Sequence, residues 1–350
     1  MKRYLTFLDT KVKDGILNEG PLGDWLSPEG NKNDNTLFWM AYQSADLAIV
    51  SKVARVLGFT AEADAYLAQS EAKKVDFNAI YVDKATHKTI KSGVKTGFMG
   101  PPNANAAPEV SDKGQLMDTQ ASYAIPLALN VINATNAPHA LAHLVETITR
   151  SNKDDQGEAR PPYSLMTGFI GTASISEALS ANGKHDIAYG LLTTKTYPSW
   201  LYSVANGATS IWERLNSYTI ENGFGGNNSM NSFNHYSFGA VAAWMYTHSL
   251  GIQRDETSPG YKHFILQPTP DPTGKITYAK GNVETMYGNI KSEWSRQGNK
   301  TTYRFTIPAN TSAQVKLPKG KIVNVAVKTN TNADRMSFEL GAGVYEFVVE

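Results

Sequence analysis

The spacing of hydrophobic residues divides the chain into two parts. Up to about residue 250, apolar side chains recur three and four positions apart, as they do on one face of a helix. The first clear pattern contains Phe38, Ala41, Ala45 and Ala48 and stops at Gly58, a residue type that often follows a helix end. Similar patterns predict roughly eight helices in this part, joined alternately by short and long loops.

After about residue 254 the period of the pattern changes to two. Short runs alternate apolar and polar residues between turns rich in Gly, Asn, Pro and Lys, and they cover residues 290–294, 303–307, 313–317, 322–327 and 345–349. Such runs are typical of a small antiparallel β-sandwich, here of about 95 residues. We therefore predict two domains, a helical one over residues 1–253 and a β-sandwich over residues 254–350.

Composition narrows the classes of function. At 350 residues, 41% of them hydrophobic, the chain can bury a substantial core. Its 33 basic and 32 acidic residues nearly cancel, so nothing favours nucleic acid or an anionic membrane as a partner. The absence of cysteine excludes disulfides and thiolate metal sites. No apolar run is long enough for a transmembrane helix, and residues 1–15 have the pattern of an amphipathic helix rather than a targeting peptide.

The most informative segment for chemistry covers residues 197–236. Trp212, Glu213 and Arg214 are consecutive there, amid aromatic and small residues, and His235 follows a Gly- and Asn-rich loop. Aromatic faces bind the C–H surfaces of sugars, amides and His bind hydroxyls, and a carboxylate transfers protons. The segment therefore predicts a carbohydrate site with Glu213 as its catalytic candidate. The alternative is that Glu213 forms an ion pair with Arg214 or another basic group.

Several segments together carry a resemblance to a known family. In chain order they are GDWL at 23–26, DTQASYAIPLAL at 118–129, the stretches 165–192 and 197–217, NHYSFGAVAAWMY at 234–246, and PGYKHFILQP at 259–268. This set resembles the α-L-rhamnosidases of glycoside hydrolase family 78 over essentially the whole chain. The resemblance implies the C-terminal part of an (α/α)6 barrel, a six-hairpin toroid, followed by the small antiparallel β-sandwich.

The resemblance also implies that part of the enzyme is missing. The family's barrel has more helices than the roughly eight predicted here. Its other acidic motif, which would carry the general acid, lies before the GDWL-like segment, and nothing in residues 1–22 matches it. We therefore expect this chain to be a piece of the enzyme that lacks the N-terminal barrel helices, with the general acid outside it.

The family's inverting mechanism assigns a role to Glu213. One carboxylic acid protonates the leaving oxygen, and a carboxylate roughly 6.5–9.5 Å away activates water on the opposite face of the sugar. Glu213 matches the general base, no cofactor is needed, and the substrates would be rhamnose-terminated plant glycosides or polysaccharides such as pectin side chains. After Trp-Glu-Arg the family commonly has Trp-Asp, whereas this chain has Leu215 and Asn216. That difference should reshape the pocket wall and leaves the preferred sugar open.

The resemblance extends to four substrate-binding candidates, Asp24, Trp25, Trp212 and His235. His235 would bind a sugar hydroxyl, or else be a satisfied histidine at a helix start. Neither a second His nor a carboxylate stands near His235 at ligand spacing, so no metal site is predicted. The indole of Trp25 would face the apolar side of the sugar and Asp24 a hydroxyl, although Trp25 could equally anchor the loop in the core.

The same alternative, pocket wall or core, applies to Trp212 and Trp200, and we favour the wall only for Trp212. For Asp118 we favour a structural role as a helix N-cap. The remaining aromatics, Tyr197 among them, are more often core residues than substrate contacts.

Three rival functions stay open. A barrel enzyme of this kind could act on another sugar, and this chain could bind carbohydrate without turnover because it lacks the acid. A purely structural role would require the aromatic-rich loops to be buried. The linkage cleaved, the aglycone, the oligomeric state and the compartment are not determined by the sequence.

Overall fold

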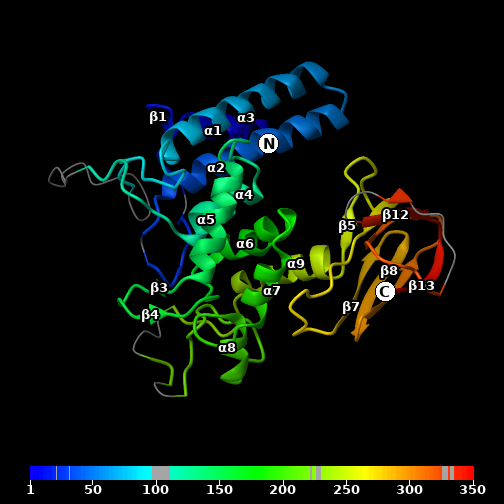
Figure 1. Cartoon of the computed structure of the whole chain (residues 1–350). Coiled ribbons are helices and arrows are strands. Elements are labelled where there is room, and N and C mark those ends of the chain that lie inside the picture. Colours follow the sequence, from blue (N-terminus) through cyan, green and yellow to red (C-terminus); the bar gives the residue numbers. More distant parts are fainter. Residues whose placement is uncertain are drawn as a thin grey trace. The chain divides into compact units, whose positions relative to one another are not determined.

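The computed structural model describes residues 1–20, 22–30, 32–96, 111–220, 223–225, 230–324, 330–331 and 335–350 (Figure 1). Its contacts divide the chain into two compact units. The first contains Met1–Gly183 and Thr194–Gly239, and the second contains Lys184–Thr193 and Ala240–Glu350.

The first unit is mainly helical. Its helices are α1 (Lys2–Asp9), α2 (Asn35–Val56), α3 (Thr60–Tyr81), α4 (Gln120–Ala128), α5 (Ala137–Thr149), α6 (Phe169–Ala181) and α8 (Trp200–Ala205). Two short hairpins complete it, β1 (Val12–Lys13) with β2 (Ile16–Leu17) and β3 (Asn152–Lys153) with β4 (Ala159–Arg160).

The helices of this unit pack both against their neighbours in the chain and against helices further along it. Helices α2 and α3 lie side by side, α4 packs against α5 and α6, and α2 also contacts α4 (Figure 1). Asp34 begins α2 by accepting a hydrogen bond from the Thr36 N–H, and Gly58, with φ 82°, follows its end as the apolar pattern predicted. Residues 120–126 of α4 are all buried, Pro126 included, so α4 runs through the core of the unit.

The second unit joins three short helical segments to two sheets. The helical segments are α7 (His185–Thr193), α9 (Val241–Trp244) and the π-helix η2 (Met245–Ser249), and the 3-10 helix η1 (Ser237–Ala240) precedes α9 in the chain. The strands are β5 (Ile252–Arg254), β6 (His263–Leu266), β7 (Tyr278–Thr285), β8 (Gly288–Gln297), β9 (Lys300–Ile307), β10 (Ser312–Pro318), β11 (Asn330–Thr331), β12 (Arg335–Leu340) and β13 (Gly343–Val349).

The two sheets share one apolar core. One has the strand order β11-β12-β10-β6-β5 and the other the order β13-β9-β8-β7. Alternate residues of the strands face inward, and Phe264, Trp294, Phe305 and Val315 are almost completely buried in a common cluster. The Trp294 indole N–H donates to the Ser249 carbonyl at 2.9 Å, so the cluster also anchors the helical segment before β5.

The predicted succession of helices followed by an antiparallel sandwich is confirmed, with one addition. Strand β10 pairs in parallel with β6, in register from Ser312 with His263 to Val315 with Leu266, because a long connection returns the chain beside β6. The other pairs in both sheets are antiparallel. Of the predicted run 322–327, Ile322 forms an isolated bridge with Val349, and residues 325–327 lie outside the described part.

The helices differ from the prediction in two details. The last helical pattern before the strands, which begins near Ser237, forms a succession of 3-10, α and π segments instead of one continuous helix. Helix α7 groups with the second unit because the Tyr189 hydroxyl contacts both the Ser249 hydroxyl and the Thr269 carbonyl, at 2.8 and 2.7 Å. The domain boundary at residue 253 stays a prediction. None of the described helices is long and apolar enough to cross a membrane.

Candidate active site

A cleft of about 840 Å³ lies within the first unit. Its walls come from loops: residues 22–28 with Gly30, the start of α2 at 33–35, the segment 91–96, and short stretches near Asp155, Tyr197 and Arg214. Asp24 and Trp25 line it, as do Arg214, Leu215 and Asn216, whereas Trp212, Glu213 and His235 are not among its lining residues. Of the predicted site residues, Asp24 and Trp25 of the Gly-Asp-Trp-Leu segment therefore line the cleft.

Asp24 is buried at 8% exposure, and both of its carboxylate oxygens contact the start of α6. Oδ2 accepts a hydrogen bond from the Gly168 N–H at 2.7 Å, and Oδ1 accepts one from the Gly171 N–H at 2.8 Å. Burial raises the pKa of Asp24 to about 6, although these backbone donors favour the charged form. The half-buried Trp25 follows it, and its carbonyl accepts from the Phe169 N–H at 3.0 Å.

Glu213 is buried at 9% exposure and has no cationic partner among the described residues. Its N–H donates to the Ser232 carbonyl, and its Oε2 accepts from the Ser232 N–H, both at 2.8 Å. Arg214 points its Nε to the Met230 carbonyl at 2.9 Å instead. The alternative of an ion pair between Glu213 and Arg214 is therefore wrong.

The same pairing places His235 beside the Trp-Glu-Arg segment. The His235 N–H donates to the Ile211 carbonyl at 2.8 Å, so that residues 211–213 and 232–235 run alongside each other. The His235 ring stacks on Phe169, with ring centres 4.8 Å apart, and its Nδ1 accepts from the Ser237 N–H at 3.4 Å. The two candidates that the sequence separates by a loop thus lie on neighbouring segments.

Trp212 is buried at 6% exposure and meets the edge of Phe233 at 5.3 Å between ring centres. Its role as a pocket wall stays a prediction. Trp200 is also buried and donates its indole N–H to the Phe238 carbonyl at 2.8 Å, as expected of a core residue.

Leu215 and Asn216, where the sequence departs from the family pattern, both line the cleft. The two residues that differ from the family pattern therefore lie in the cleft wall, as the sequence predicted. The Leu215 carbonyl accepts from the Ser203 hydroxyl at 2.9 Å, which ties this wall to α8.

Sequence reasoning missed Tyr197 as a cleft residue. It lines the cleft, and the Arg160 guanidinium lies over its ring at 4.8 Å while Tyr202 meets it edge-on at 5.4 Å between ring centres. Burial raises the pKa of Tyr197 to about 12, so its hydroxyl stays neutral. Its position at the head of the informative segment, just before Pro198, was the available signal.

A second missed group is Glu29, which follows the Gly-Asp-Trp-Leu segment. It is buried at 6% exposure, and burial raises its pKa to about 7. One oxygen contacts Lys32 Nζ at 3.4 Å, and the other, Oε2, has no hydrogen-bond partner among the described residues. The segment 23–30 thus holds two buried carboxyl groups with raised pKa values.

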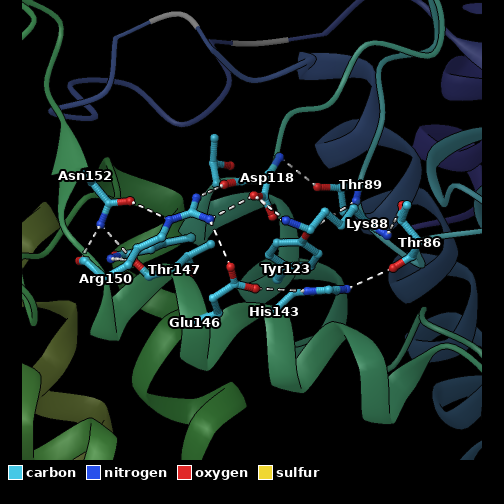
Figure 2. Close-up of polar contacts among 12 residues, drawn as sticks. Thr86, Lys88, Thr89, Asp118, Tyr123, His143, Glu146, Thr147, Arg150 and Asn152 are labelled. Carbon is cyan, nitrogen blue, oxygen red and sulfur yellow. Dashed lines mark hydrogen bonds and ion pairs between the residues drawn. The ribbon is translucent and has the colours of Figure 1, made fainter.

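The predicted N-cap role of Asp118 is wrong, because the neighbouring Thr119 caps α4. With its extended backbone, Thr119 accepts from the Ser122 N–H through Oγ1 at 3.2 Å. Figure 2 shows that Asp118 instead receives Lys88 Nζ and Arg150 Nη1 on Oδ2, at 3.0 and 2.9 Å.

The Tyr123 hydroxyl donates to the other oxygen of Asp118 at 2.7 Å (Figure 2). Burial alone would raise the pKa of Asp118, but the bonds from Tyr123, Lys88 and Arg150 outweigh it and hold the pKa below its usual range. Thr119 Oγ1 also donates to Oδ1 of the cleft residue Asn33 at 2.6 Å. The residue after Asp118 therefore contacts one wall of the cleft.

Metal chemistry has no evident site among the residues described. No group of three or more His, Asp or Glu side chains within that part of the chain is arranged to hold a metal ion.

Comparison with known families covers nearly the whole chain. Residues 1–249 match the model of the bacterial alpha-L-rhamnosidase 6 hairpin glycosidase domain, and residues 251–332 match that of the bacterial alpha-L-rhamnosidase C-terminal domain. An alpha-L-rhamnosidase of an Alteromonas species is 30% identical over 99% of this chain, and one of Formosa agariphila is 31% identical over 91% of it. The chain spans 34% and 31% of the length of these two curated relatives.

Solved structures agree with the sequence comparisons. The alpha-L-rhamnosidase of Streptomyces avermitilis complexed with L-rhamnose matches all of this chain with a TM-score of 0.78 at 25% identity, and the chain covers 30% of it. That of Dictyoglumus thermophilum matches with a TM-score of 0.79 at 26% identity, again over the whole chain and over 36% of the larger protein. The chain therefore belongs to the bacterial alpha-L-rhamnosidase family, with its six-hairpin glycosidase domain in residues 1–249 and its C-terminal domain in residues 251–332.

Proposed function

We propose that this chain forms part of an inverting α-L-rhamnosidase that removes terminal α-L-rhamnosyl residues from plant glycosides or polysaccharides. Family membership supports the reaction class, and the relative solved with L-rhamnose supports the sugar. The observation that carries the proposal is Glu213, a buried carboxylate in the Trp-Glu-Arg segment whose Oε2 accepts one backbone N–H and, among the described residues, contacts no cation.

Glu213 is the general base in this proposal. It takes a proton from a water molecule that attacks the anomeric carbon, while the bond from that carbon to the leaving oxygen breaks. The departing oxygen needs a proton from a second carboxylic acid, roughly 6.5–9.5 Å from the first. We assign that acid to no residue of this chain. A neighbouring cation would favour the carboxylate form and make the group a weaker base, and no such cation contacts Glu213 among the described residues.

Three side chains would hold the sugar. Trp25 offers an indole face in the cleft wall to the apolar side of the deoxy sugar. His235 is oriented by its stacking on Phe169, and its Nε2 has no hydrogen bond to a described residue, so it is available to a sugar hydroxyl. Trp212 would support the site from its packing with Phe233. The carboxylate of Asp24, the fourth predicted contact, is engaged by the amides of α6 instead.

One observation favours a second candidate function. Because the chain spans about a third of its curated relatives, it could bind the sugar without turning it over. A barrel enzyme for another sugar is the remaining alternative, and the replacement of the family's Trp-Asp by the cleft residues Leu215 and Asn216 bears on it.

The test is hydrolysis of an aryl α-L-rhamnoside with a good leaving group, because such a substrate needs little help from an acid. We expect turnover that releases β-L-rhamnose first, and a loss of roughly 10²–10⁴-fold in Glu213→Gln. The matched control is Glu62→Gln, which changes an exposed glutamate paired with Lys2 in the same unit.

Other outcomes separate the alternatives. Binding of L-rhamnose with no turnover identifies a binding fragment, and faster cleavage of another aryl glycoside in a panel identifies another sugar. Undiminished turnover in Glu213→Gln would contradict the assignment of the base.

A further inference from the structure

Asp24 connects two segments that are far apart in the chain. Its two oxygens accept the N–H groups of Gly168 and Gly171, at the N-cap and in the first turn of α6. The next residue repeats the connection, because the Trp25 carbonyl accepts the Phe169 N–H at 3.0 Å. Gly168 has no side chain with which to cap its own helix, so the free amides of α6 are satisfied from the turn at residues 23–26.

The close approach depends on two glycines of α6. A Cβ at Gly168 would stand 2.2 Å from the Trp25 carbonyl oxygen, and a Cβ at Gly171 would stand 2.9 Å from Oδ2 of Asp24. Both distances are shorter than carbon–oxygen contacts allow, and the obstacle at Gly168 is backbone that cannot move aside. The turn therefore fits against α6 only because both positions lack side chains.

The turn itself is held in an unfavourable conformation. Leu26 has φ 58°, in the left-handed region that a leucine rarely adopts. Such a conformation persists only where the surrounding structure fixes it. The three hydrogen bonds to α6 are the contacts that fix this turn from one side.

No nearby cation offsets the cost of burying the Asp24 carboxylate, among the described residues. No Lys or Arg contacts its carboxylate among the described residues, and burial makes the charged form costly. Asp24 therefore forms no ion pair with a Lys or Arg among the described residues. Its carboxylate instead holds the turn in place through the two hydrogen bonds from α6. Trp25 is covalently next to it and lines the cleft, so any displacement of Asp24 from α6 moves the indole as well.

We propose that Asp24 is a positioning residue, which docks the turn at residues 23–26 onto the first turn of α6 and thereby fixes Trp25 in the cleft wall. The importance of this for sugar binding rests on the proposed function, whereas the docking itself does not. In this proposal Asp24 does not bind a sugar hydroxyl directly. It also does more than cap α6, because its contacts determine the position of Trp25.

The experiment compares Asp24→Ala and the milder Asp24→Asn with the unmodified chain. The first readout is amide hydrogen exchange at Gly168 and Gly171, and the second is acrylamide quenching of Trp25, isolated by subtracting the Trp25→Phe form of each variant. We expect exchange at both amides to accelerate roughly tenfold or more and Trp25 to become more accessible. The third readout is L-rhamnose affinity, which we expect to fall along with the order of Trp25.

The matched control is Asp34→Asn, which alters another buried carboxylate at a helix start, that of α2. It should lower stability and leave exchange at Gly168 and Gly171 unchanged, so it separates docking from general destabilisation. A second way of breaking the same dock is Gly168→Ala, which keeps the carboxylate and should reproduce the increase in Trp25 accessibility.

Two results would overturn the proposal. If Asp24→Asn lowers rhamnose affinity while exchange and Trp25 quenching stay as in the unmodified chain, Asp24 is a direct sugar contact. If exchange accelerates and Trp25 stays as protected as before, Asp24 is only a cap. If the unmodified chain does not bind rhamnose, the proposed function fails, and the first two readouts still decide whether Asp24 positions Trp25.

Discussion

The buried carboxylates of the helical unit and the exposed charges of the four-stranded sheet have different surroundings. Across the sheet, Lys280, Glu293, Arg304 and Glu346 face one another in register on successive strands, with alternating sign. Arg304 pairs with both glutamates, and all three side chains are between 39% and 50% exposed. Such pairs replace water that would solvate the charges equally well, so they contribute little stability.

Two carboxylates of the helical unit, one lining the cleft and one next to a lining residue, are buried instead. Asp24 and Glu213 accept hydrogen bonds from backbone N–H groups, and neither has a cationic partner among the described residues. Asp118 lies between these extremes, with two cations and a tyrosine hydroxyl on a carboxylate that is mostly shielded. A buried carboxylate without a cationic partner is costly to ionise, so residues of this kind are candidates for a functional site.

The largest effect should come from the core of the β unit rather than from any charge. Trp294→Ala removes a fully buried indole and its hydrogen bond to the Ser249 carbonyl. We expect the free energy of unfolding of this unit to fall by about 3–5 kcal/mol. Chemical denaturation, followed by hydrogen exchange in β8 and in α6, measures it. If amide protection from hydrogen exchange falls as much in α6 as in β8, the two units unfold together, contrary to this prediction.

The pH dependence of stability should reveal the cost of burying Asp24. Its folded pKa of about 6 lies above its ordinary value of 3.8, so the stability that it contributes is complete below about pH 4 and is lost as the pH rises through 6. The amide in Asp24→Asn does not titrate. Relative to the unmodified chain, the variant should therefore gain up to about 3 kcal/mol between pH 4 and pH 7.

Urea unfolding at a series of pH values gives this difference directly. The carboxamide introduced by Asp24→Asn has only one acceptor oxygen, so its NH₂ group faces one of the two backbone donors and adds a penalty that does not depend on pH. Parallel stability curves for the two proteins would mean that Asp24 titrates normally in the folded chain.

Asp118→Ala should have an intermediate effect, because it leaves Lys88, Arg150 and the Tyr123 hydroxyl without their shared acceptor. We expect the free energy of unfolding to fall by about 2 kcal/mol, less than for a fully buried pair because both cations reach solvent. Thermal unfolding measures it. Asp83→Ala, which alters a more exposed aspartate bonded to Thr86, is the control for loss of a carboxylate near the same segment.

The smallest effect should come from the charge row of the sheet. Arg304→Ala removes both of its ion pairs and should change the free energy of unfolding by less than about 1 kcal/mol, an effect that shrinks further as salt is added. If Arg304→Ala lowers the free energy of unfolding as much as Asp118→Ala does, exposed and buried charges contribute equally, contrary to this comparison.

Local patterns predicted the elements of this fold and left out their long-range contacts. The period of α2, and the alternation in β8 and β9, follow from side chains that neighbour one another in sequence. The parallel pairing of β10 with β6, and the docking of Asp24 on Gly168, join residues that no local pattern relates. The cap of α4 was misplaced by one residue, because Asp118 and Thr119 are equally good caps until Arg150 and Lys88 are seen to take the aspartate.

The candidate site divides in the same way. The residue types around Glu213 and His235 indicated a sugar site, and the Gly-Asp-Trp-Leu segment indicated its second wall. Tyr197 was missed although it begins the informative segment, because its ring packs against Arg160, which is distant in the sequence.

The most direct test of a sugar site beside the buried carboxylates is calorimetric titration of L-rhamnose into the unmodified chain, Trp25→Ala and Tyr278→Ala. Tyr278 is an exposed aromatic on β7 and serves as the matched control. We expect saturable binding that weakens about tenfold in Trp25→Ala and is unchanged in Tyr278→Ala. No saturable heat with the unmodified chain, or equal weakening in both variants, would contradict this expectation.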